Sequence, residues 1–360
     1  MIKSAHIRHF KGLSELEVND LARVSLLGGR NNVGKTSLLE ALFLYFDRAN
    51  PEAFIRQYAW RNIPVVSLNP ETLWAPMFTM YDMGQDIQIN VLDEQEKLSK
   101  LTIRLNKNYI RQIAVSHPAF PGISGQINTK AKSSPRLSLD LIHQTDQEPP
   151  ETIHYTLEPQ GIGFEIENAA IQAGTAVFLA ATTRINPQED AIRLGQLDII
   201  GKQQEIVEFL RETVEPRLQA LTTIAVGEQS LIHAQLDGLP RKIPVSYMGD
   251  GMSRLLSLIL VMTTTPNGFV LVDEIENGIH YSALPKVWLG IVKAAQQFNC
   301  QVFATTHSQE CLQAAVQALP EDLRDQFCYV RLERKGEHIQ GKTYSHEVLG
   351  AALERDWEVR

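Results

Sequence analysis

The sequence is poor in cysteine, and its cysteines share no spacing that indicates a joint role. Cys300, Cys311 and Cys328 form no CxxC pair and no even-numbered disulfide framework. This pattern argues against a disulfide-stapled secreted domain and predicts reduced, mostly buried thiols. The start of the chain, MIKSAHIRHFKG, also lacks the continuous apolar core and the cleavage site of a signal peptide. We therefore expect a cytoplasmic protein.

Long apolar runs and positive net charge are missing as well. The run LLSLILVM in the C-terminal half is far shorter than the ~20 residues that a membrane-spanning helix needs, so no membrane partner is expected. The net charge is -8 at pH 7, so contact with nucleic acid would require a local basic stripe. The remaining composition, 44% hydrophobic and 21% charged over 360 residues, is typical of one large or two medium globular domains.

The order of strand-like and helix-like segments predicts an α/β fold. IKSAHIRHF and LSELEV alternate like two strands of a hairpin, and RVSLLGG indicates a strand that leads into a helix from Lys35. In the last third, the strand segments GFVLVDE and CQVFATTHS alternate with helical segments. Strands that alternate with helices predict a parallel sheet.

The middle of the chain has a different character. DIQINVLD, KLTIRL and ETIHYTLE look like strands of an antiparallel sheet, and PAFPGISGQINTKAKSSPRLS among them is typical of a mobile loop. QQEIVEFLRETVEPRLQAL is expected to form one amphipathic helix. The organisation that we expect is an N-terminal lobe (1–50), a β-rich insertion (51–175), a C-terminal lobe (176–345) and a C-terminal helix (346–360).

The segment GGRNNVGKTS has the spacing of a phosphate-binding loop: Gly29, four residues, Gly34, Lys35 and Thr36. Between a strand and a helix, the backbone N–H groups of such a loop can converge on phosphates at the helix N-terminus. Lys35 would reach the β- and γ-phosphates, Thr36 would give its hydroxyl to Mg2+, and Ser37 is placed for the α-phosphate. The alternative, an ordinary glycine turn, is disfavoured by this context. The candidate nucleotide-binding residues are Gly29, Asn31, Asn32, Val33, Gly34, Lys35, Thr36 and Ser37.

Two adjacent carboxylates, Asp273 and Glu274, end the apolar strand FVLV. Ligands of an open α/β sheet gather at this end of its strands. One carboxylate can hold Mg2+ through water, and the other can polarise the attacking water as general base. We expect Asp273, with Thr36, to be the metal residue and Glu274 to be the catalytic one. A plain boundary between strand and loop is the alternative. His307 follows the next apolar strand, and we expect it on the γ-phosphate side as a second catalytic residue.

Five motifs occur in the order found in ABC-type ATPase heads: FKGLSELEV, GRNNVGKTSLLEAL, GDGMSRLL, VDEIENGIHYS and QVFATTHS. In these motifs the chain resembles the bacterial RecF/OLD-like, SMC-related ATPases, which are often described as AAA-type ATP-binding proteins. The resemblance implies an ABC/SMC-type head, a P-loop NTPase with a mixed sheet and flanking helices, that uses ATP and Mg2+. It further implies that Gly29 to Ser37 form Walker A, that Asp273 and Glu274 end Walker B, and that His307 is the switch histidine.

The resemblance also assigns YMGDGMSR to the signature position, where Gly249 and Gly251 flank Asp250 at a helix start. In the family this helix start faces the γ-phosphate bound by a second subunit, so that two ATP molecules lie between two heads. A glycine-opened helix N-terminus can offer N–H groups to a phosphate. Gly249 replaces the usual signature serine, so backbone donors and Ser253 would have to compensate, and we expect slow turnover. ENGIH, after Glu274, matches the stretch that carries communication between the two sites.

Two further positions stay open. The motifs do not fix the glutamine that senses Mg2+ in the family, and Gln85, just before DIQINVLD, is the best candidate. Lys11, after the first strand, is either a nucleotide contact or a solvated turn lysine.

Several uses for the ATPase compete. In the OLD family the head is joined to a Toprim nuclease domain; the residues after His307 leave no room for it and contain no DxD pair, so we expect any such nuclease to be a separately encoded effector. A RecF- or SMC-like clamp on DNA would need a basic stripe, although the acidic total favours a solvated face. The residues available for that stripe are Lys107, Arg111, Lys130, Lys132 and Arg136.

Two other classes fit less well. The nucleotide-binding subunit of a transporter would want an LSGGQ-type signature, and a nucleotide-gated scaffold with little turnover is favoured only by Gly249. We expect an Mg2+-dependent ATPase that forms an ATP-sandwich homodimer or higher oligomer. Its expected role is to drive a separate effector in anti-phage defence or DNA maintenance, with direct DNA binding left open.

Overall fold

The computed structural model describes residues 1–63, 65–110, 135–146, 148–159, 161–167, 175–181, 186–336, 338–355 and 357–358. The strands are β1 Ile2–Phe10, β2 Leu13–Val18, β3 Val24–Gly28, β4 Ile87–Asp93, β5 Leu98–Tyr109, β6 Arg136–Thr145, β7 Glu151–Glu158, β8 Gly161–Glu167, β9 Ala176–Leu179, β10 Leu218–Val226, β11 Gln229–Leu236, β12 Ile243–Pro244, β13 Phe269–Val272, β14 Gln301–Thr305, β15 Phe327–Lys335 and β16 His338–Ser345. The α-helices are α1 Lys35–Phe46, α2 Ala53–Ala59, α3 Pro70–Leu73, α4 Pro187–Ile199, α5 Gln203–Thr213, α6 Asp250–Thr264, α7 Leu284–Gln297, α8 Gln309–Ala318 and α9 His346–Glu354. Short 3-10 helices are η1 Ala75–Met77, η2 Thr79–Tyr81, η3 Val245–Met248, η4 Tyr281–Ala283 and η5 Glu321–Gln326.

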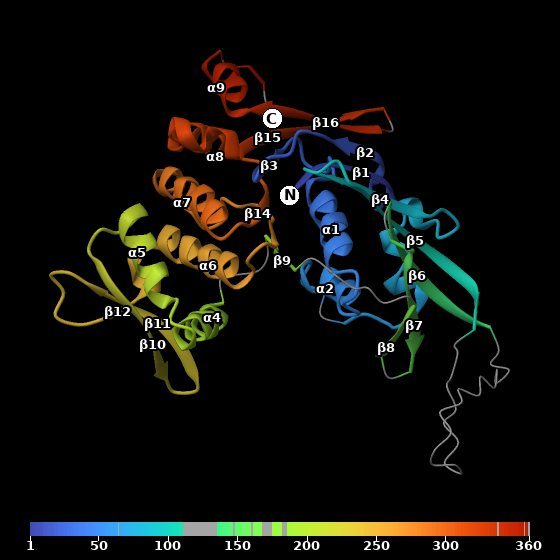
Figure 1. Cartoon of the computed structure of the whole chain (residues 1–360), viewed down its shortest axis with the longest axis horizontal. Helices are drawn as coiled ribbons and strands as arrows, with labels where there is room; N and C mark the ends of the chain where they lie inside the picture. The colour runs from blue at the N-terminus through green and yellow to red at the C-terminus, as the bar shows by residue number, and fades with distance from the viewer. Residues whose placement is uncertain are drawn as a thin grey trace, which may run out of the picture.

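A mixed sheet of 13 strands runs through the molecule in the order β8-β7-β6-β5-β4-β1-β2-β16-β15-β3-β14-β13-β9. Helices flank it, and β10, β11 and β12 form a small second sheet beside α4 and α5 (Figure 1). The strands β15, β3, β14, β13 and β9 pair in parallel, as the alternation of strands and helices predicted. The predicted fold class is therefore confirmed.

The parallel strands separate two hydrophobic cores. Successive side chains of a strand point to opposite faces, so Val270 and Val302 enter the core of α4 to α8. Leu271 and Phe303, their neighbours in the chain, enter the core that contains α1. In Figure 1, α6, α7 and α8 accordingly lie on one side of β14 and α1 lies on the other.

Helix α1 is buried on more sides than its sequence pattern predicted. Helical spacing places Leu38, Leu42 and Phe46 on one apolar face, but every residue from Leu38 to Phe46 is buried. The reason is that α1 packs on the parallel strands and also on β1 and β4 (Figure 1). The helix therefore lies between the parallel strands and the antiparallel part of the same sheet.

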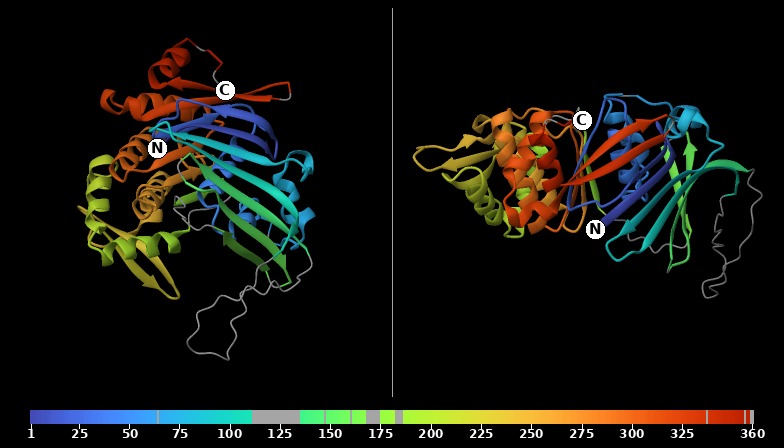
Figure 2. Two further views of the ribbon diagram at one scale, coloured as in Figure 1. Left: turned by 45° about the vertical axis from the view of Figure 1, so that its right-hand side comes forward. Right: turned by 90° about the horizontal axis from the view of Figure 1, so that it is seen from above.

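The antiparallel strands β4 to β8 continue the sheet beyond the hairpin β1–β2 (Figure 2). The three strands predicted here are confirmed as β4, β5 and β7, and β6 and β8 add to them. The loop predicted over residues 118–138 ends earlier than expected, because residues 136–138 already belong to β6. Residues 118–134 of this prediction lie outside the described residues.

One predicted helix is too long. The segment 203–221 is not a single helix, because α5 ends at Thr213 and β10 begins at Leu218. Pro216 between them has no N–H for a helical hydrogen bond. In the part of the chain that the structure describes, no helix is both long and apolar enough to cross a membrane.

Candidate functional site

The phosphate-binding loop connects β3 to α1, and its glycines are required by sterics. Gly29 and Gly34 have φ of 130° and 99°, a region that favours glycine. A Cβ at Gly29 would collide with the backbone oxygen of Leu332, and one at Gly34 with the side chain of Leu13. No side chain among the described residues caps the N-terminus of α1. The first N–H groups of this helix are therefore left for a ligand.

Lys35 lies over the loop. Its Nζ donates to the backbone oxygens of Gly29 at 2.7 Å and of Arg30 at 3.1 Å. Burial lowers the pKa of Lys35, and the nearby carboxylates of Asp273 and Glu274 oppose this shift. The ammonium group thus stands between the loop and the Walker B carboxylates, where a phosphate would give it a charged partner.

A chain of hydrogen bonds joins the two Walker motifs. The Thr36 hydroxyl donates to the Asp273 carboxylate at 3.0 and 3.1 Å. The hydroxyl of Thr305 donates to Asp273 at 2.6 Å and accepts from the backbone N–H of Glu274 at 2.7 Å. Asp273 is buried, and burial raises the pKa of its carboxyl group. Sequence reasoning missed Thr305, whose role follows from the position of β14 between β3 and β13.

Glu274 and His307 lie at the exposed edge of this network. Glu274 has a φ of 47°, and its side chain accepts from Asn277 at 2.8 Å. His307 Nδ1 lies 3.7 Å from Glu274 Oε1 and 3.3 Å from Glu276 Oε1. The structure therefore brings together Lys35, Thr36, Asp273, Glu274 and His307, as the motifs predicted.

Glu276 holds the segment of His307 in place, and sequence reasoning did not identify it. Its Oε1 accepts from the hydroxyl of Thr306 at 2.8 Å and from the backbone N–H of His307 at 3.0 Å. The ENGIH stretch that contains it was singled out only through the resemblance. A third carboxylate, two residues after Glu274, was the available signal.

The predicted signature lies at the start of α6, on the other side of the parallel strands from α1. Gly249 is exposed, with φ 100° and ψ 157°, and no atom lies within 4 Å of the position of a Cβ. Gly251 is tightly packed, because a Cβ there would lie 2.9 Å from that of Ala283. The Ser253 hydroxyl donates to the backbone oxygens of Val245 and Gly249, both at 3.3 Å. Among the described elements, α6 packs mainly on α4, α5, α7 and η3.

The remaining candidate residues of the loop differ in exposure. Asn31 and Asn32 are exposed at the tip of the loop, and Asn32 has a φ of 59°. Val33 is buried and packs against Gly29, which anchors the loop to the core. Ser37 lines a cavity of about 670 Å3 that opens beside the first turn of α1.

Lys11 is not a solvated turn lysine. Its Nζ lies 2.6 Å from the carboxylate of Glu40, which is buried in α1 and also pairs with Arg61. Burial lowers the pKa of Lys11 to about 8, and Glu40 opposes that shift. Lys11 and Arg61 line the same cavity as Ser37, together with Tyr58 and Tyr81. A glutamate within the apolar run of α1 was the sequence signal for this cluster.

The weaker candidates are not gathered at the site. Gln85 is exposed, and its amide donates to Asp82 at 2.9 Å. In the predicted basic stripe, Lys107 and Arg136 are exposed. Arg111, Lys130 and Lys132 lie outside the described residues.

The pair Thr36–Asp273 fits a cation that arrives with a nucleotide. Mg2+ is usually bound by one or two carboxylates together with phosphates and waters. No group of three or more His, Cys, Asp and Glu that could hold a metal by itself is found in the described ranges. Asp273 is a buried carboxylate that accepts from hydroxyl groups, and burial raises its pKa because it disfavours the charged form. An adjacent cation would favour the charged form again.

A comparison with known proteins finds a relative that matches along the whole chain. A protein of Helicobacter pylori (strain ATCC 700392 / 26695) named "ATP/GTP phosphatase" is 23% identical over 376 residues, which cover 99% of this chain and 99% of that protein. Among solved structures, an SMC head bound to the C-winged helix domain of ScpA matches with a TM-score of 0.49 and 11% identity over 98% of this chain and 99% of that one. The SMC head domain from Thermotoga maritima matches with a TM-score of 0.42 and 11% identity over 96% and 99%.

A family model matches residues 24–312, which contain the phosphate loop, the signature, the Walker B carboxylates and His307. Its description is "AAA domain, putative AbiEii toxin, Type IV TA system". The match covers most of the chain, and the predicted recognition of an AAA-type ATPase is thereby confirmed. The chain belongs to this family and is an ATPase.

Proposed function

We propose that the chain hydrolyses ATP with Mg2+ at the junction of β3, β13 and β14. The observation that carries this proposal is the hydrogen-bonded chain from Thr36 through Asp273 and Thr305 to Glu274. It ties the phosphate loop to the Walker B carboxylates. The name of the Helicobacter pylori relative supports nucleoside triphosphate hydrolysis.

Each residue has a distinct proposed role. Residues Gly29 to Ser37 hold the phosphates through backbone N–H groups, and Lys35 exchanges its loop carbonyls for the β- and γ-phosphates. Glu274, at the exposed edge, takes a proton from the attacking water. His307 lies beside it, where its imidazole can contact the γ-phosphate. Thr36 and Asp273 would hold Mg2+, which would supply charge neutralisation at the phosphate oxygens.

We further propose that two copies complete the site. The exposed start of α6 lies on the opposite face of the parallel strands from the helix that carries Lys35. Its N–H groups therefore fit the nucleotide of a second copy better than that of their own chain, with Gly249 at the contact. Gly251 lies against Ala283, which follows ENGIH, so the signature and that stretch can respond to each other.

The ATP-bound dimer then acts on a separate partner. The family description names a toxin–antitoxin system, which couples two gene products. This supports an ATPase that gates a separately encoded effector, such as a Toprim-type nuclease, in anti-phage defence or DNA maintenance. Residues 1–50, 51–175, 176–345 and 346–360 would serve as N-terminal lobe, β-rich insertion, C-terminal lobe and C-terminal helix.

The concentration dependence of turnover tests the proposal. The specific ATPase activity of the full chain is measured with Mg2+ over a range of protein concentrations, beside Lys35→Ala and light scattering with ATP. A two-copy site makes the specific activity rise with protein concentration until the dimer saturates. Lys35→Ala is expected to abolish both turnover and the ATP-driven dimer.

The two parts of the proposal fail separately. A monomer with a constant specific activity at all concentrations would remove the two-copy site and leave the ATPase assignment intact. Turnover that is equal in Lys35→Ala and the unchanged chain would remove the assignment of the phosphate loop.

A further inference from the structure

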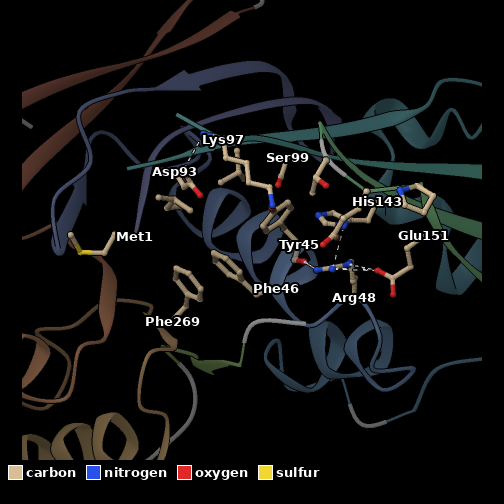
Figure 3. A pocket seen from close by; sticks show the side chains of 15 residues that line it. Met1, Tyr45, Phe46, Arg48, Asp93, Lys97, Ser99, His143, Glu151 and Phe269 are labelled. Atoms are coloured by element: carbon tan, nitrogen blue, oxygen red, sulfur yellow. Dashed lines mark hydrogen bonds and ion pairs between the residues drawn. The ribbon is translucent and has the colours of Figure 1, made fainter. Parts of the chain in front are cut away.

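A second cavity lies at the far end of α1, away from the phosphate loop. Its volume is about 320 Å3, and it is lined by Tyr45, Phe46 and Arg48 with residues of β5, β6 and β7 (Figure 3). Phe269, the first residue of β13, forms part of its wall. This volume is at the lower end of the roughly 300–1,000 Å3 that small-molecule sites occupy. A small ligand is therefore the right size.

An ionic cluster forms one side of the cavity. Arg48 and Glu151 are each only 5% exposed, and Arg48 Nη2 lies 3.3 Å from Glu151 Oε2. The same nitrogen lies 3.3 Å from His143 Nδ1. His143 and Glu151 stand directly opposite each other in the β6–β7 pairing. Figure 3 shows these three side chains together at the cavity wall.

Three polar atoms of this wall are buried without a hydrogen-bond partner in the described part of the chain: His143 Nε2, Thr145 Oγ1 and Glu151 Oε1. Buried polar groups are nearly always paired, so a partner from outside the chain is expected. Because Arg48 donates to His143 Nδ1, the neutral ring carries its hydrogen on Nε2. Burial supports the neutral form, since it lowers the pKa of His143 to about 4. The wall thus offers a donor at His143 beside an acceptor at Glu151.

Another part of the cavity lining is aromatic. Phe46 and Phe269 stack with ring centroids 3.5 Å apart and an interplanar angle of 11°. Tyr45 meets Phe46 edge-on at 5.2 Å. Such surfaces favour a flat, apolar ring face.

The charges around the cavity disfavour a phosphate. Asp93, Glu148 and Glu151 line it against Lys97, Arg48 and the N-terminal ammonium of Met1, but Arg48 already has Glu151 as its partner and the ammonium has Glu94. The cavity also lies at the C-terminus of α1, the negative end of the helix dipole. A ligand without an anionic group is favoured.

We propose that this cavity binds an uncharged planar heterocycle of the nucleobase kind, as a free base or a nucleoside. Its edge would accept from His143 and donate to Glu151, a pair of neighbouring groups that every nucleobase carries. The site is independent of the ATPase proposal. It touches the ends of α1 and β13 whose other ends carry Lys35 and Asp273, so the ligand is placed to change the ATPase rate.

Binding of nucleosides to the full chain tests this site. Adenosine, guanosine, cytidine and uridine, with their 5′-monophosphates, are titrated by calorimetry into the chain saturated with a non-hydrolysable ATP analogue and Mg2+. Saturation keeps the phosphate loop from contributing. We expect at least one nucleoside to bind, and its monophosphate to bind at least tenfold more weakly.

Variants locate the binding. Thr145→Val, a nearly isosteric change, is expected to lower the affinity for the nucleoside at least threefold. Glu151→Gln is expected to lower it at least tenfold. Thr102→Val on β5 does not line the cavity and is the matched control. Glu151→Gln also removes the negatively charged partner of Arg48, so the fold of this variant is checked by thermal unfolding. If Glu151→Gln is unfolded, Thr145→Val alone tests the site. The proposal is overturned if no nucleoside binds, or if the monophosphate binds as tightly as its nucleoside. It is also overturned if the folded Thr145→Val and Glu151→Gln variants bind the nucleoside with unchanged affinity.

Discussion

The phosphate loop and the start of α6 are both helix N-termini opened by glycine, but their surroundings differ. Gly29 and Gly34 are enclosed by Leu332 and Leu13 of the same chain. Around Gly249, by contrast, the space for a side chain is empty to 4 Å. The first site is assembled by the chain itself, whereas the second is presented outward. This contrast supports the proposal that catalysis is prepared in one copy and completed by another.

The polar groups of the two regions differ in the same way. Thr36, Asp273 and Thr305 are hydrogen-bonded across three elements that are distant in sequence. At the start of α6, the Ser253 hydroxyl donates to the backbone oxygens of Val245 and Gly249, which are close to it in the chain. Changes in the first region should therefore act within one copy, and changes in the second between copies.

The largest effect is expected from Glu274→Gln, inside the prepared region. The amide keeps the shape of the side chain but cannot take a proton from water, so turnover should fall by roughly 10²–10⁴-fold. ATP binding should persist, and an ATP-bound dimer should accumulate. Turnover is measured by phosphate release and the dimer by light scattering.

Glu212→Gln on the exposed surface of α5 is the matched control and should keep full activity. If Glu274→Gln hydrolyses ATP within twofold of the unchanged chain, Glu274 is not the general base.

The next effect contrasts the two regions directly. Gly249→Arg places a bulky group where the partner would dock, and Lys35→Ala empties the phosphate loop. Each variant alone should lose nearly all activity. When the two variants are combined in equal amounts, half of the dimers contain one copy of each. Each of these mixed dimers has one of its two sites intact, so about a quarter of the activity of the unchanged chain should return.

Gly249 suits this test better than Gly251, because a side chain at Gly251 would press on Ala283 within its own chain. The arginine at Gly249 adopts a strained φ at a cost of about 1–3 kcal/mol, so its fold is checked by thermal unfolding. If both variants are folded and a mixed dimer forms without recovered activity, the shared site loses its support.

The sequence predicted those parts of the site whose residues are close together in the chain. The spacing from Gly29 to Thr36 is local, and so is the pair Asp273 and Glu274 after an apolar strand. Thr305 and the pairing of Lys11 with Glu40 depend on which strands and helices become neighbours. The glutamate within the apolar run of α1 signals a buried charge, but no local pattern encodes which elements become its neighbours. For the same reason the sequence did not predict that α1 is buried all round, nor that β6 and β8 extend the sheet.

A smaller effect is expected from Glu276→Gln. Glu276 Oε1 accepts from Thr306 and from the backbone of His307, while its Oε2 is buried without a partner among the described residues. Glutamine keeps one acceptor and loses the charge beside the imidazole. Because Glu276 is a positioning residue, the substitution should lower kcat roughly fivefold to tenfold, which corresponds to about 1 kcal/mol, and should leave the KM for ATP unchanged. A change in KM alone would instead place Glu276 in nucleotide binding.

The smallest effect is expected from Ser253→Ala, and its size decides how the signature works. The missing signature serine left Ser253 as a candidate donor to the partner's γ-phosphate. In the structure its hydroxyl donates to the backbone of Val245 and Gly249 at 3.3 Å, long distances that a phosphate could replace. Backbone N–H groups at the start of α6 remain in the alanine variant, so kcat should fall less than about threefold. Ser257→Ala, which removes a hydroxyl bound to Asp190 deeper in α6, is the control for a general effect on this helix. A tenfold loss in Ser253→Ala but not in Ser257→Ala would mean that the hydroxyl turns to the phosphate in the dimer.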